Sequence, residues 1–119
     1  MARSPFTPIT TAASGVVLAS GVPVDAGNGN EWTNTGRSFI EIFNNSASAI
    51  TATFVTNGTY NVGTTAYAIA DQTVTVAASG TVGVGPFDTA LYNSATSTVQ
   101  VNWSSGTSIA ARVILLGTS

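Results

Sequence analysis

The sequence predicts an all-β fold, a single-domain antiparallel β-sandwich of the jelly-roll type, and three observations predict it. The chain is rich in Thr, Ser, Val and Gly and contains one Met and no lysine, so residues that favour strands and turns outnumber good helix formers. Several segments of strand length alternate apolar and polar residues with a period of two. Clusters of Gly, Asn and Ser separate these segments, as turns do.

The N-terminal residues 1–14 are interpreted as an extended arm that precedes a sandwich domain at residues 15–119. Pro5 and Pro8 fix φ, remove backbone donors and disfavour helix in the residues before them. The arm carries Phe6 and Ile9 as isolated apolar residues. With 119 residues, the chain is long enough for one core and too short for two.

The first strands of the domain are predicted from local pattern. Residues 15–19 form a first short strand, and residues 25–31 form a loop of residues that tolerate positive φ. In residues 37–44, apolar side chains fall on both alternating faces, which predicts an interior strand covered on both sides. Residues 49–55 alternate Ile, Ala and Phe with Thr, which predicts a half-buried partner in a hairpin with that strand.

The second half of the domain begins with a long loop at residues 56–70, for which an edge strand stays open as an alternative. Residues 73–76 and 80–84 are predicted as short strands around a compact turn. Asp88 is placed to cap one helical turn at residues 89–92.

A final pair of strands is predicted at residues 99–103 and 109–116, separated by a turn at residues 104–106. In the first of these strands, Val99, Val101 and Trp103 are expected to face the protein core. Arg112 lies in the middle of the second, either on a solvent face or paired with an acid.

Composition excludes most enzymatic chemistry. The chain has no histidine and no cysteine, so Ser-His-Asp and Cys-His arrangements and imidazole or thiolate metal sites are excluded, and no cofactor is expected. Only 7% of residues are charged, and three arginines, Arg3, Arg37 and Arg112, are too few for binding nucleic acid through phosphates. We expect neither a signal peptide nor a membrane span.

The five acids are expected to serve structure. Catalysis by paired carboxylates needs two facing acids, and nothing in the spacing pairs them. We expect turn, cap or strand roles for these acids, with no catalytic and no metal-binding residue among them: Asp25, Glu31, Glu41, Asp71 and Asp88. The loop at residues 25–31 offers closely spaced oxygen ligands, so a calcium site stays open as an alternative to a plain turn.

Aromatic residues are the remaining candidates for binding. Trp103 continues an inward-facing row, whereas Trp32 follows a polar loop and is our candidate for an exposed anchor. A carbohydrate-binding platform stays open as an alternative, built from Trp32, Tyr60, Tyr67, Tyr92 and Trp103.

Three segments carry a resemblance to a known group of proteins. Residues 36–45 (GRSFIEIFNN), 73–80 (TVTVAASG) and 85–93 (GPFDTALYN) resemble small virion proteins of tailed bacteriophages, of the capsid decoration or cement type. The resemblance extends over roughly residues 34–116. It implies a compact β-sandwich, often a homotrimer, that sits on the outside of the shell and ties neighbouring capsid subunits together.

A binding role on the capsid exterior is therefore the expected function, with the major capsid protein lattice and further copies of the chain as partners. We expect arm residues 2–11 to add a strand to a neighbour's sheet edge, with an interface of Pro5, Phe6, Pro8, Ile9 and Trp32. Deletion of residues 1–11 is then expected to abolish binding and leave the fold intact. A head fibre, tail or connector piece and a carbohydrate-binding or adhesive module remain alternatives.

Overall fold

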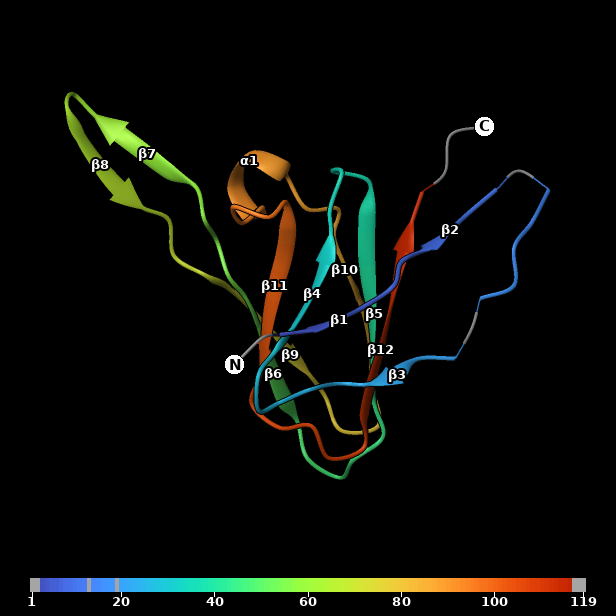
Figure 1. The fold of residues 1–119 in the computed structure, drawn as a ribbon. Coiled ribbons are helices and arrows are strands. Elements are labelled where there is room, and N and C mark those ends of the chain that lie inside the picture. The colour runs from blue at the N-terminus through green and yellow to red at the C-terminus, as the bar shows by residue number, and fades with distance from the viewer. Residues whose placement is uncertain (1–2, 13, 19, 117–119) are drawn as a thin grey trace.

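Two mixed β-sheets pack face to face in the computed structural model, which describes residues 3–12, 14–18 and 20–116 (Figure 1). We call them sheet A and sheet B. Each has five strands, and a separate two-stranded hairpin projects from the body. The predicted all-β sandwich is confirmed.

Sheet A has its longest strand, β11, near its centre. Its neighbours pair with it in antiparallel fashion, while β1 joins the edge of β4 in parallel. In spatial order its strands are β1 (Ser4–Pro5), β4 (Asn30–Thr33), β11 (Thr98–Trp103), β6 (Ile50–Phe54) and β9 (Gln72–Val76).

Sheet B is built on β5 (Ser38–Asn44), which lies between β10 (Thr81–Val84) and β12 (Ile109–Leu115). Two short strands share the other edge of β12. β2 (Ile9–Thr10) runs parallel to residues 114–115, and β3 (Val22–Pro23) runs antiparallel to residues 110–111. The two central residues of that edge, Arg112 and Val113, lie between them.

The chain crosses from one sheet to the other at almost every turn. It passes from β4 in sheet A to β5 in sheet B and back to β6, and it alternates again from β9 through β12. The predicted hairpin of residues 37–44 and 49–55 is therefore wrong, because its two strands lie in opposite sheets. Asn44 holds the crossing turn: its Nδ2 donates to Ser48 O at 2.9 Å, and its Oδ1 accepts from Ser46 N at 2.9 Å.

The core lies between the sheets and is lined by alternate residues of their strands. Ile40 and Ile42 of β5, Val99 and Val101 of β11, and Trp103 are buried there, as predicted for the last three. Small and β-branched side chains fill most of this layer. Besides Trp103, four core aromatic rings contact one another in a cluster that reaches Tyr92 of the short helix at residues 89–92: Phe6, Trp32, Phe54 and Phe87.

The outer face of sheet B is less covered than predicted. β5 is an interior strand, but its outward residues Phe39, Glu41 and Phe43 are only half-buried. Arg112 Nε donates to Glu41 Oε1 at 2.7 Å, which confirms the pairing of Arg112 with an acid. The guanidinium also lies 5.3 Å from the centre of the Phe43 ring, a cation–π distance.

Two segments project from the sandwich in Figure 1. One is the hairpin of β7 (Thr59–Val62) and β8 (Thr65–Ala68), within the region predicted as a long loop. The other is the linker, residues 11–21, between β2 and β3; its described residues 15–18 are not the predicted strand. The radius of gyration, 15.0 Å, exceeds the roughly 13.5 Å expected for 119 residues, in line with these projections.

One short helix, α1 (Thr89–Tyr92), lies over the end of sheet A, where the sequence predicts it. Asp88 caps it by accepting a hydrogen bond from Ala90 N at 2.8 Å, as predicted. Among the described residues, no helix is long and apolar enough to cross a membrane.

Candidate docking surface

The N-terminal arm joins the two sheets along one side of the sandwich. β1 pairs with the edge of β4 in sheet A, and β2 pairs with the edge of β12 in sheet B (Figure 1). Ser4 N donates to Gly29 O at 3.1 Å and Phe6 N donates to Glu31 O at 2.8 Å. Pro5 lies between these two donors, at the position whose N–H would point away from β4, so its missing donor costs no ladder bond. The predicted arm is thus an edge of the sandwich itself.

The loop at residues 25–31 holds the start of the arm. Ser4 Oγ donates to Asp25 Oδ2 at 2.6 Å, while the backbone N–H groups of Gly27 and Asn28 donate to Asp25 Oδ1. The bond from Ser4, followed by those from Asn28 and Gly27, lowers the pKa of Asp25 below its ordinary value of 3.8. Asp25 is therefore a turn residue that also anchors the arm.

The same loop was the open alternative for a calcium site. Its Asn30 Oδ1 accepts hydrogen bonds from Asp25 N at 2.9 Å and from Trp103 Nε1 at 2.8 Å. Among the described residues, no group of three or more Asp or Glu side chains lies together. In this structure the loop is a turn, closed by a hydrogen bond from Gly29 N to Asp25 O at 2.8 Å.

Two of the predicted interface residues lie in the core of their own chain. Phe6 is 5% exposed and Trp32 is 1% exposed, and their rings are 6.3 Å apart between centres. The interpretation of Trp32 as an exposed anchor is wrong, because its indole faces inward and donates to the buried Ser38 Oγ at 2.9 Å. Phe6 equally fills a core site of this fold, which corrects the expectation that it is a free side chain for a pocket on a different protein.

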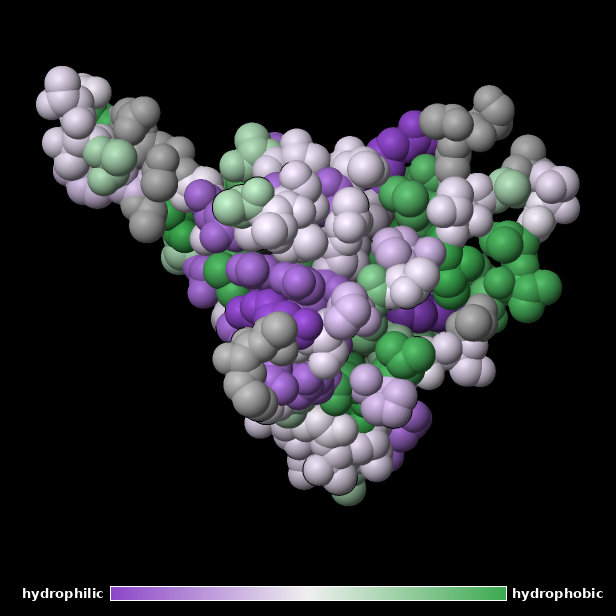
Figure 2. All heavy atoms as spheres, viewed as in Figure 1, coloured by the Kyte–Doolittle hydropathy of each residue, from purple (hydrophilic) through white to green (hydrophobic). Residues whose placement is uncertain are grey.

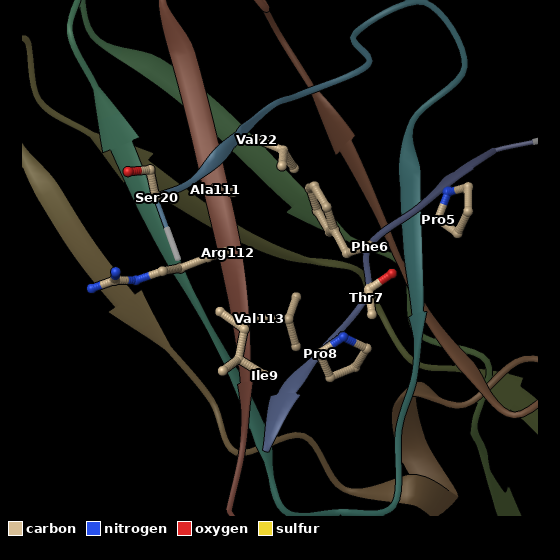
Figure 3. Close-up of a pocket in the computed structure, with 10 residues that line it drawn as sticks. All are labelled: Pro5, Phe6, Thr7, Pro8, Ile9, Ser20, Val22, Ala111, Arg112 and Val113. Atoms are coloured by element: carbon tan, nitrogen blue, oxygen red, sulfur yellow. The ribbon is translucent and has the colours of Figure 1, made fainter. Parts of the chain in front are cut away.

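The other three predicted interface residues remain accessible and lie together. Pro5 is exposed, and Pro8 and Ile9 are half-buried. They line a pocket of about 370 Å³ between arm residues 5–9 and residues 111–113 of β12, which Ser20 and Val22 close (Figure 3). The pocket lies where β2 and β3 leave the middle of the β12 edge uncovered.

Apolar side chains stand exposed on the linker beside this pocket. On the linker, Val17 is 90% exposed, Val16 is 45% exposed and Leu18 is 41% exposed; Val22 of β3, which also lines the pocket, is 50% exposed. Figure 2 shows hydrophobic residues gathered on this side of the molecule. The sequence carries no charged residue from position 4 to position 24. We call the pocket and these four residues the docking surface.

Sequence reasoning missed the linker half of this surface. Residues 16–18 are three consecutive apolar residues after Gly15, and the sequence predicts them as part of a short strand at residues 15–19. The available signal was the lack of alternation: a half-buried strand shows a period of two, and this run does not.

The remaining candidates do not form a site in the described part of the chain. Trp103 is buried, as predicted, and the Tyr92 ring packs edge-on against Phe87 at 5.1 Å, so the proposed sugar platform is not brought together there. Tyr67 is 46% exposed on the projecting hairpin, and the side chain of Tyr60 lies outside the described residues. Asp71 accepts a hydrogen bond from Thr56 N at 3.0 Å, a turn role like that of Asp25.

Comparison with family models, with curated proteins and with solved structures finds no match for this chain.

Proposed function

We propose that this chain is a structural virion protein that binds the outer surface of a phage capsid and stabilises the shell by bridging neighbouring capsid subunits. The observation that carries the proposal is the docking surface: a mostly apolar pocket, whose charged lining residue Arg112 is paired with Glu41, together with the exposed apolar side chains of Val16, Val17, Leu18 and Val22. The resemblance of residues 36–45, 73–80 and 85–93 to decoration proteins names the class of partner.

Physical chemistry favours a lasting contact at this surface. Exposing an apolar side chain such as Val17 to water is unfavourable, so covering it with a partner contributes favourable binding free energy. Since residues 4–24 are uncharged, the matching partner surface is apolar or neutral rather than basic or acidic. Specific protein contacts bury about 1,200–2,000 Å² in total, and repetition over a shell adds avidity to each of them.

The described acids support binding rather than catalysis, because each is engaged in the fold. Asp25 holds the arm, Asp88 caps α1, and Glu41 pairs with Arg112. We therefore propose no enzymatic activity, and we propose that the protein acts as a homo-oligomer, with a trimer as the favoured form.

Co-sedimentation with the shell tests the proposal. Virions of the phage that encodes this chain are stripped of it and incubated with wild-type protein or with the variant V16S/V17S/L18S. We expect the wild type to pellet with the shells and the variant to stay in the supernatant, because its apolar contact area is lost. The matched control T73S/T75S changes exposed residues on the β9 edge and should pellet like the wild type. Equal pelleting by all three proteins would contradict the proposed surface, and no pelleting by the wild type would contradict the function.

A further inference from the structure

The arm lies in a channel that every copy of the chain presents. The channel consists of the outer edge of β4, the outer edge of β12 and the core site that Phe6 fills between them. Two strands of two residues each hold the arm, together with a few side-chain bonds such as Arg3 Nη1 to Asn102 Oδ1 at 2.7 Å. All of these contacts join residues 3–11 to parts of the chain beyond the linker. They are equally available to an arm that comes from another copy.

The arm can lie in the channel of its own chain or in the channel of another copy. Only the linker has different surroundings in these two arrangements. In the closed single chain it turns back at Gly15, whose N–H donates to Ala12 O at 2.9 Å and whose φ is +92°. The turn leaves Val16, Val17 and Leu18 standing in solvent. A linker that runs on to a neighbouring copy would place these three side chains between the two molecules.

We propose that the arm is exchanged between copies of this chain: residues 3–11 of one copy occupy the channel of the next and place Phe6 in its core. Exchange of an identical element keeps every arm contact, so it is a low-cost route to assembly. The difference between the two states is the linker, and covering its apolar residues favours the exchanged state. Exchange joins separate molecules, so it increases with protein concentration. The inference rests on the homo-oligomer of the proposed function and names the contact that forms it, and it does not depend on a capsid as the partner.

Cross-linking tests the exchange directly, because the chain contains no cysteine of its own. Thr10 of β2 and Leu115 of β12 are direct neighbours in the parallel pair. The double variant T10C/L115C establishes the geometry, since its oxidation yields a disulfide between these two positions. A second pair, P5C/E31C, reports the same contact at β1 and β4 if the first variant does not fold.

The decisive sample mixes the two single variants. T10C and ¹⁵N-labelled L115C are unfolded together in urea, refolded at high concentration and oxidised, and the linked peptides are identified by mass spectrometry. We expect a disulfide between the unlabelled and labelled chains, in a species of twice the 12.0 kDa chain mass. In this mixture, a lasting contact between positions 10 and 115 requires an exchanged arm, and random collision adds only a background.

Matched controls separate exchange from random collision. T10C mixed with labelled T75C, an exposed position on the β9 edge, sets the collision background. Introducing V16S/V17S/L18S into both single variants should lower the cross-link, because the covered apolar area is lost. A cross-link between T10C and L115C no higher than the T75C background, with the intrachain disulfide of the double variant intact, would overturn the proposal.

Discussion

The indole nitrogen of Trp103 donates a hydrogen bond of 2.8 Å to Asn30 Oδ1 inside the sandwich. The same amide accepts from Asp25 N and donates from Nδ2 to Ser4 O at 3.1 Å. One side chain of β4 thus links the last residue of β11, the turn at residue 25 and the first strand of the arm. Asn30 is 2% exposed, and its bond from Trp103 is buried, whereas its bonds to Asp25 and Ser4 are partly buried.

Replacing Asn30 with Ala should destabilise the protein. The Trp103 indole N–H would be left buried without its acceptor, which costs about 1–3 kcal/mol of unfolding free energy. Urea denaturation measures the loss. The control N45A removes an exposed amide on the turn after β5 and should change stability by less than about 0.5 kcal/mol. Equal stability of N30A and the wild type would show that the bond to Trp103 contributes nothing.

Removing the Phe6 side chain should lower the free energy of unfolding by more than the N30A substitution does, because Phe6 brings the arm into the core. For F6A we expect a loss of about 3–5 kcal/mol, the range for truncating a buried Phe. Deletion of residues 1–11 should lower the melting temperature at least as much as F6A does. This replaces the expectation that the truncated protein keeps its fold. T7A, on an exposed arm position, is the control. A truncated protein with wild-type thermal stability would show that the arm is dispensable.

Acid should weaken the arm anchor through Asp25. The bonds from Ser4, Asn28 and Gly27 lower the pKa of Asp25 in the folded state below 3.8, its ordinary value. Folding is therefore stabilised by the ionised group above that value, and this stabilisation is lost as pH falls through the lowered pKa. NMR titration of the Asp25 carboxyl should show the low pKa in the wild type and a rise toward 3.8 in S4A. An unchanged pKa in S4A would contradict the role of Ser4.

The N-cap of α1 should stabilise the hydrogen bonds of residues 57–58, at the base of the projecting hairpin. Leu91 O, near the end of the helix, accepts from the N–H groups of Asn57 and Gly58 at 2.8 and 2.9 Å. D88A removes the N-cap, worth ~1 kcal/mol, and should speed amide hydrogen exchange at Gly58. D88N keeps a capping side chain and should exchange like the wild type. Unchanged exchange in D88A would mean that the hairpin base does not depend on the helix.

The positions of most strands could be predicted from the sequence, but their partners could not. Alternation places Ile40, Ile42, Val99, Val101 and Trp103 on inward faces, because a period of two decides which side of a sheet a residue occupies. It does not decide which sheet receives the strand. The turn at residues 45–49 suits a hairpin equally well, and the chain crosses the core there because both flanking strands have an apolar face to bury.

The candidate surface could be predicted only in part, for a related reason. The prolines of the arm pointed to Pro5, Pro8 and Ile9, which line the pocket. Burial of Phe6 and Trp32 depends on the distant strands β4 and β12 meeting the arm, and no local pattern encodes that contact. The exposure of Val17 was missed because an apolar residue is expected inside unless its neighbours fail to reach it.

Quantitative mass spectrometry of virions purified from the source of this sequence tests the proposed function most directly. The measurement counts copies of this chain against copies of the major shell protein. Decoration of the shell predicts a simple ratio between the two, with the chain present in hundreds of copies per particle. A dozen copies or fewer would place the chain in a portal, tail or fibre instead, and its absence from the particle would contradict a virion role altogether.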